Sequence, residues 1–169
     1  PLQEMQIPDL HNHLVIIGKD PAAVKLSTMV KETNMPHISI IFDPIIAQEQ
    51  MKIGDTVIYG DATNEPILEK AHIDTAQMVV LSVGDLIPAT LMLENIRKRN
   101  KKAYVIVRTQ TIKNVEQLYK LGANQVIAEK LEIAIDIFNR ILLKKHVPQR
   151  EINRTLSHLR NLALGEHRI

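Results

Sequence analysis

The residues that follow the first apolar run, Gly18, Lys19 and Asp20, occupy the position at which open α/β sheets hold a nucleotide phosphate. A dinucleotide-binding turn normally carries three glycines there, but Asp20 and Ala23 stand in the second and third places. Alanine still permits close packing of helix on strand. The Asp20 carboxylate crowds the phosphate seat, and like charges about 4 Å apart repel by roughly 1–4 kcal/mol. The cation Lys19 could partly offset this repulsion. The turn therefore predicts weak or absent dinucleotide binding and leaves a mononucleotide as an alternative.

A second candidate, Asp43, follows the apolar run 37–42 and precedes Pro44. At the end of the second strand of such a sheet, a carboxylate accepts hydrogen bonds from the ribose hydroxyls and repels a 2′-phosphate. The hypothesis that Asp43 binds ribose therefore favours NAD or an adenosine nucleotide over NADP. The alternative is an ordinary turn aspartate before a proline.

Further polar residues end three other apolar runs and are expected at the same edge of the sheet. Asp61 could accept a hydrogen bond from an adenine amino group, and Thr63 could bond the base or the amides of the next helix. The Arg108 guanidinium could grip a phosphate with two hydrogen bonds. The alternatives are turn and cap roles for the first two residues and a surface salt bridge for Arg108. The full set of candidates from these runs is Asp61, Ala62, Thr63, Ser82, Val83, Gly84 and Arg108.

The elements that must position these residues are six short apolar runs that alternate with helical patterns. The runs cover residues 13–17, 37–42, 56–59, 77–82, 103–107 and 125–128. Strands that are buried on both faces are typical of a parallel sheet covered by helices. The sequence therefore predicts a Rossmann-like, doubly wound α/β domain with a parallel six-stranded sheet over residues 12–130. A flavodoxin-like sheet without a ligand is the alternative.

The chain outside this domain is expected to form a linker and two helices. Residues 1–11 resemble the end of a linker. Residues 131–146 are apolar around most of a helix, so this helix requires burial on two sides, either within its own domain or against a second subunit. The segment 147–169 carries a narrower apolar stripe and is predicted to be an amphipathic helix with a tail.

Composition excludes several other classes of protein. The chain has no cysteine, which removes disulfides, thiolate catalysis and cysteine zinc sites. A net charge of +2 and an aromatic content of 3% argue against a nucleic-acid partner. The histidines lack metal-ligand spacing, and no nucleophile elbow occurs. We therefore expect no metal site and no catalytic residues.

Two long segments resemble the RCK or KTN nucleotide-binding domains of potassium channels, potassium transporters and Kef-type cation/proton antiporters. The first is VIYGDATNEPILEKAHIDTAQMVVLSV (57–83), and the second is AYVIVRTQTIKNVEQLYKLGANQVIAEKLEIAIDIFNRIL (103–142). The matching features are Gly60 to Thr63, Arg108, Leu121 to Asn124 and Glu129 with the apolar helix that follows it. The second subdomain of the channel members is not recognisable, which favours an antiporter-type or single-lobe regulator.

The resemblance implies a cytoplasmic regulatory domain without enzymatic activity. Its implied ligand is AMP or another adenine nucleotide, with weakly bound NAD or NADH and no ligand at all as alternatives. Its implied partners are a second copy of itself, held through the helix at 131–146, and a membrane transport domain on the same chain, a K⁺/H⁺ antiporter. It would lie on the cytoplasmic side of the inner membrane. A ligand-free dimerisation module and an NAD-linked oxidoreductase are the alternative functions.

Overall fold

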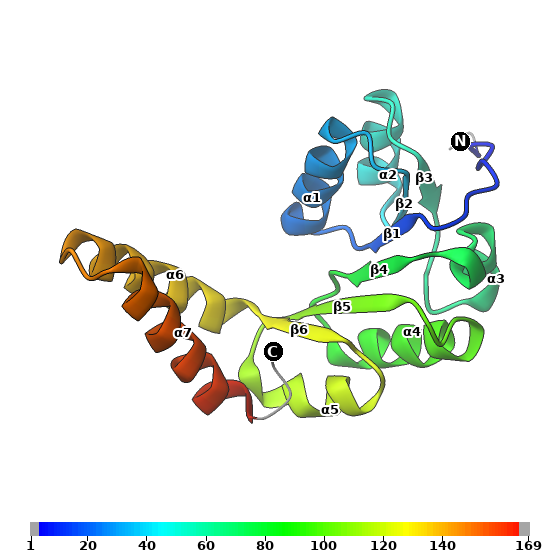
Figure 1. Ribbon diagram of the computed structural model, residues 1–169. Helices are drawn as coiled ribbons and strands as arrows, with labels where there is room; N and C mark the ends of the chain where they lie inside the picture. Colours follow the sequence, from blue (N-terminus) through cyan, green and yellow to red (C-terminus); the bar gives the residue numbers. More distant parts are fainter. Residues whose placement is uncertain (1–3, 166–169) are drawn as a thin grey trace.

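The computed structural model describes residues 4–165, which form an α/β sheet domain and a projecting helical hairpin (Figure 1). All six strands are parallel, in the order β3-β2-β1-β4-β5-β6. The strands are β1 (Leu14–Ile17), β2 (His37–Ile41), β3 (Val57–Tyr59), β4 (Met78–Leu81), β5 (Tyr104–Thr109) and β6 (Gln125–Ala128). The strand order reverses at β1, so the predicted doubly wound, Rossmann-like fold is confirmed.

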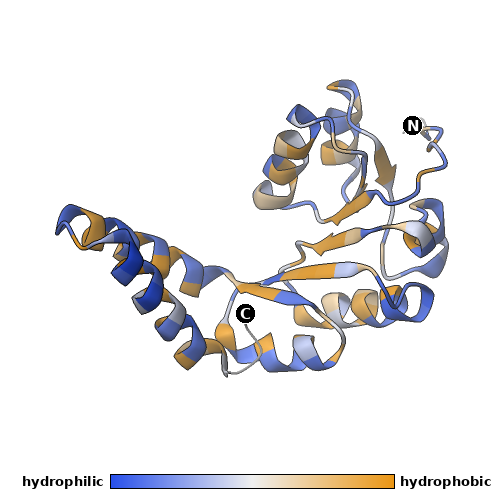
Figure 2. Ribbon diagram, in the orientation of Figure 1, coloured by the Kyte–Doolittle hydropathy of each residue, from blue (hydrophilic) through white to orange (hydrophobic). Residues whose placement is uncertain are grey.

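Helices cover the two faces of the sheet unequally. The helices are α1 (Pro21–Glu32), α2 (Pro44–Lys52), α3 (Glu65–Lys70), α4 (Leu86–Arg99), α5 (Val115–Lys120), α6 (Glu129–Lys144) and α7 (Gln149–Leu164), with short 3₁₀ turns at Ile73–Thr75 and Ile112–Asn114. Strand β1 shows the division, because Leu14 and Ile16 pack with Val30 of α1. Val15 and Ile17 instead share the main core with residues of α3, α4 and α5. Figure 2 shows the apolar residues concentrated in the central strands that both layers cover.

The α1 side of β5 and β6 carries no helix of its own. Ile106 pairs with Val80, which in turn pairs with Ile16, so Ile106 points to the same side of the sheet as the α1-facing residues. Residues directly paired across parallel strands share a face, which also places Tyr104 and Ile127 on this side. Both of these side chains are exposed, even though Tyr104 belongs to β5, an internal strand of the sheet, and Ile127 is apolar. An apolar strip of sheet is therefore left open beside α1.

The two C-terminal helices pack mainly against each other, and among their described residues only Leu131 of α6 and Ala163 and Leu164 of α7 also join the main core of the sheet domain. Ile135 of α6 is buried between Ile152 and Leu156 of α7, and Val147 closes the turn between the two helices. The predicted amphipathic helix after Pro148 is thus present and pairs with α6. Only one side of α6 is covered in this way, whereas its all-round apolar character called for burial on two sides. The end of the predicted tail, residues 166–169, lies outside the described residues.

A buried polar chain fixes α1 against β2. The hydroxyl groups of Ser27 in α1 and Ser39 in β2 are hydrogen-bonded at 2.8 Å, and Ser39 donates to the Asp55 carboxylate at 3.2 Å. His37 Nε2 lies 2.7 Å from the same carboxylate. The hydrogen bond from His37 to Asp55 raises the pKa of the imidazole above its ordinary value. Because buried polar groups are costly without partners, this network holds the two elements in one arrangement.

Candidate functional site

A cleft of about 510 Å³ lies at the carboxyl ends of the strands, where β1 and β4 lead into helices on opposite faces. In open α/β sheets this switch point is the place where ligands bind. The turn after β1 and the N-terminal half of α4 form two of its walls, and the loop after β3 forms another. The cleft brings together nine of the twelve residues predicted from sequence, namely Gly18, Lys19, Asp20, Asp61, Ala62, Thr63, Ser82, Val83 and Gly84.

Gly18 makes the tight turn possible at the floor of this cleft. Its φ angle is +154°, and its amide donates a hydrogen bond to the carbonyl of Ile40 at 3.1 Å. A Cβ atom on Gly18 would lie 2.4 Å from the carbonyl oxygen of Ser82 and 3.0 Å from the Cβ of Ala23. The first glycine of the motif is therefore required here for sterics as well as for backbone conformation.

Asp20 and Arg108 meet as an ion pair behind the cleft. The Arg108 guanidinium bonds to the Asp20 carboxylate, donates from Nε to Ser82 Oγ at 2.9 Å, and donates from Nη1 to Glu129 at 2.8 Å. Asp20 also caps α1 by accepting from the amide of Ala23 at 2.8 Å. The repulsion that the sequence predicts between Asp20 and a phosphate is thus opposed by a cation. The same contacts occupy the guanidinium that the sequence offers as a phosphate ligand.

The loop after β3 is held in shape by its own side chains. Asp61 Oδ1 accepts from the amide of Thr63 at 2.9 Å and from the Thr63 hydroxyl at 2.7 Å. The carbonyl of Thr63 accepts from Asn95 of α4 at 3.1 Å, which ties the loop to the opposite wall. The other oxygen of Asp61 accepts no hydrogen bond from the part of the chain that the structure describes. Lys19 is exposed at the mouth of the cleft and has no ion pair among the described residues.

Asp43, Pro44 and Arg108 do not line the cleft. Asp43 caps α2, with one carboxylate oxygen accepting from the amides of Ile45 and Ile46 at 3.0 Å each. Phe42 lines the cleft at this corner instead, and its ring lies 6.2 Å from that of Tyr59.

Sequence reasoning missed Phe42 and the residues of the α4 wall. The α4 residues that line the cleft are Ile87, Pro88, Leu91 and Met92. Helical periodicity assigns such apolar residues to a core, and it carries no signal that some of them face a cleft. For Phe42, the low aromatic content of the chain is the signal that could have drawn attention to it, because a rare aromatic residue at the end of a strand is a candidate for contact with a ligand.

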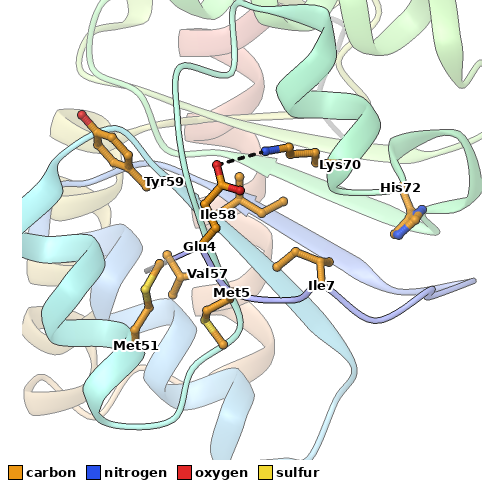
Figure 3. A pocket seen from close by; sticks show the side chains of 9 residues that line it. All are labelled: Glu4, Met5, Ile7, Met51, Val57, Ile58, Tyr59, Lys70 and His72. Atoms are coloured by element: carbon orange, nitrogen blue, oxygen red, sulfur yellow. Dashed lines mark ion pairs between the residues drawn. The ribbon is translucent and has the colours of Figure 1, made fainter. Parts of the chain in front are cut away.

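A second cavity of about 610 Å³ lies at the free edge of β3, under the N-terminal segment (Figure 3). Its floor is formed by Val57 and Ile58 with two methionines, Met5 and Met51. The charged side chains Glu4 and Lys70 pair with each other at 3.7 Å across its rim. This cavity lies beside the edge strand β3 and not at the point where the strand order reverses, so the switch-point cleft is the better candidate.

The fold and the cleft together define a class of protein, the Rossmann-like domains with a ligand site at the switch point. Within residues 4–165, no cluster of three or more histidine or acidic side chains could hold a metal ion. No helix in that part of the chain is both long and apolar enough to cross a membrane. The chain belongs to the TrkA-N domain family, whose model matches residues 14–129. The predicted membership of the RCK and KTN domains is confirmed.

Named relatives of this chain include an antiporter and two structurally characterised domains. The putative K(+) efflux antiporter KefB of Alkalimonas amylolytica is 26% identical over 160 residues, which is 95% of this chain but only 24% of the relative. The TrkA-N domain of the inner membrane protein ybaL from Escherichia coli has a TM-score of 0.74 at 24% identity, covering 78% of this chain and 97% of that one. The Kef CTD of Shewanella denitrificans in AMP-bound form has a TM-score of 0.74 at 20% identity, covering 92% and 96%. Similarity at this level to solved structures establishes the fold.

Proposed function

We propose that this chain is the nucleotide-sensing regulatory domain of a monovalent cation transporter, a K⁺/H⁺ antiporter, on the cytoplasmic side of the membrane. The observation that carries the proposal is a cleft at the switch point of a TrkA-N domain, lined by Lys19, which forms no ion pair with any described residue. The domain is proposed to have no enzymatic activity. A bound nucleotide would act by its unequal affinity for two arrangements of the assembly, which biases the attached transport domain.

The proposed ligand is an adenine mononucleotide, with AMP the first candidate. A cleft of about 510 Å³ lies within the range of small-molecule sites. The second glycine of a dinucleotide turn lets the backbone approach a pyrophosphate, but here the Asp20 side chain fills that place and is held by Arg108. A single phosphate beside Lys19 avoids this obstacle, whereas a pyrophosphate does not. The AMP-bound state of the Shewanella denitrificans domain supports the same choice.

A thermal-shift screen with AMP, ADP, ATP, NAD and NADH tests the proposal. A nucleotide present at a hundred times its dissociation constant stabilises the native state by about 2.7 kcal/mol, equivalent to roughly 5–10 °C in Tm for a domain of this size. We expect the largest shift with AMP and the smallest with the dinucleotides. A Tm that no nucleotide changes would leave the ligand-free dimerisation module as the function.

Lys19→Glu sharpens this test. Reversing the charge of Lys19, the one cation among the described residues that line the cleft, is expected to weaken AMP binding by about tenfold or more, because a like charge then faces the phosphate. Lys25→Glu is the matched control, since Lys25 is also exposed, lies two turns away on α1 and does not line the cleft. Equal losses of AMP affinity in both variants would mean that only the overall charge matters and that the phosphate does not bind beside Lys19.

The second part of the proposal is a homodimer held through α6. Ile133, Ile137 and Ile141 recur every four residues along α6, and each is at least half exposed. A stripe with this spacing is one continuous face of the helix. The uncovered apolar strip on β5 and β6, with Tyr104 and Ile127, is a second surface of the same character. Both would be buried if α6 of each copy packed against the other copy.

We expect Ile137→Asp to convert a dimer into a monomer of 19.2 kDa, as measured by size-exclusion chromatography with light scattering. A carboxylate in the centre of an apolar interface must be desolvated without a partner, and this cost opposes association. Ile53→Asp is the control, since Ile53 is 54% exposed and Ile137 55%, but Ile53 follows α2, far from the hairpin in the fold. A wild-type chain that is monomeric at all concentrations would contradict the proposed dimer.

A further inference from the structure

The corner of the cleft at the end of β2 is built unlike a sugar-binding corner. In dinucleotide-binding sheets, a carboxylate close after β2 accepts hydrogen bonds from the ribose. Here β2 ends at Ile41 and α2 begins at Pro44, so the connection consists of Phe42 and Asp43 alone. Of these two residues only Asp43 has a side chain that can accept a hydrogen bond, so the connection cannot serve both a sugar and the helix cap. Asp43 is the cap, and Phe42 is the residue left to face the cleft.

The Asp43 carboxylate is committed to α2. One of its oxygens accepts from the amides of Ile45 and Ile46 at 3.0 Å each, which satisfies two groups at the helix N-terminus that would otherwise have no partner. The side chain does not line the cleft. Turning it toward a ribose would give up both hydrogen bonds.

Phe42 presents an unusual exposed aromatic face. Its side chain is 56% exposed, and Tyr59 beside it is 41% exposed. The whole chain holds only two phenylalanines, three tyrosines and no tryptophan, so two of its five aromatic rings lie together at this corner. The opposite wall is apolar as well, with Ile87 and Leu91 of α4 exposed. A flat apolar group fits between these walls better than a sugar does.

We infer that Phe42 determines the specificity of the cleft by stacking on the base of an adenine nucleotide, in place of a carboxylate that grips the ribose. This inference rests on the proposed nucleotide binding and adds the part of the ligand that is recognised. Every base has a π face, and one base–aromatic stack changes affinity by a factor of about ten to a hundred. The ribose 2′-hydroxyl then contributes nothing to the affinity.

Isothermal titration of the full chain with AMP, 2′-deoxy-AMP and ribose 5-phosphate tests the inference. We expect AMP and 2′-deoxy-AMP to bind within about twofold of each other and ribose 5-phosphate to give no binding signal. Phe42→Ala is expected to weaken AMP binding by tenfold or more, and Phe42→Trp to retain it. Because the Phe42 ring is exposed, its truncation should leave the Tm close to that of the wild type.

Asp43→Asn is the matched variant at the neighbouring position. Asparagine caps helices about as well as aspartate, so this variant should fold and bind AMP within twofold of the wild type. A tenfold loss with 2′-deoxy-AMP, accompanied by a similar loss in Asp43→Asn, would overturn the inference and return the ribose to the carboxylate. Wild-type protein that binds neither AMP nor 2′-deoxy-AMP would contradict the proposed function itself, an outcome distinct from ligand binding that does not depend on Phe42.

Discussion

Gly18→Ala is expected to destabilise the domain by about 3 kcal/mol or more, the sum of backbone strain and overpacking. The added Cβ would lie 2.4 Å from the carbonyl oxygen of Ser82, which is main chain at the end of a central strand and cannot rotate away. The φ angle of +154° is also one that alanine rarely adopts. Relief would require β1 and β4 to separate at the switch point.

Chemical denaturation monitored by circular dichroism measures this effect, and Gly84→Ala is its control. Gly84 lines the same cleft, but its φ angle is not in the positive region. A Cβ there meets only the end of the flexible Gln110 side chain, at 3.3 Å. We expect this control to lie within about 0.5 kcal/mol of the wild type. Equal stability of the two variants would show that the close approach of Gly18 to Ser82 is relaxed in solution.

Asp20→Asn is expected to increase the affinity for AMP by about tenfold or more, whereas NAD binding should stay weak because the asparagine side chain still fills the place of the second glycine. Asparagine keeps the cap on α1, since its amide oxygen can still accept from the amide of Ala23. Removing the charge takes away the repulsion of the phosphate and releases the Arg108 guanidinium from its ion pair. The guanidinium keeps its bonds to Ser82 and Glu129, but its Nη2 group is then free to donate to the phosphate.

A double-mutant cycle separates these two contributions. Arg108→Met in the Asp20→Asn background should return the affinity to near the wild-type value if the released guanidinium is the cause. Asp85→Asn is the control for charge alone, because Asp85 lines the cleft, is exposed and makes no side-chain cap on α4. An equal gain in Asp85→Asn would contradict the release of Arg108 and reduce the effect to net charge.

The two-residue connection between β2 and α2 shows how far local sequence reasoning reaches and where it stops. Asp43 has the right distance from Gly18 for a ribose ligand, but a connection of two residues leaves it no role other than the cap of α2. Counting loop residues after the exact end of β2 would have indicated this role. That end is among the least reliable features of a pattern, because strand boundaries shift by a few residues.

The sequence of α6 predicts that this helix is buried on two sides, and the fold of one chain buries only one of them. Its apolar residues predict burial on two sides. α7 covers the side that carries Ile135, and the side that carries Ile137 remains exposed. The pattern is therefore only half satisfied within the described residues, and the proposed dimer is an arrangement that would bury the exposed side.

By itself, the sequence determined the parallel doubly wound sheet, its helices and the grouping of most strand-end residues in one cleft. It could do so because hydrophobic periodicity is local, and parallel strands with helical crossovers bring their carboxyl ends to one edge. Only the tertiary structure decided that Asp20 pairs with Arg108, 88 positions away. That contact depends on β5 lying next to β4 and β4 next to β1, which lets an arginine reach across the end of β4 to the cap of α1. Which side chains pair across a sheet depends on the order of the strands and on the side-chain rotamers. The spacing of residues along the chain predicts neither of these.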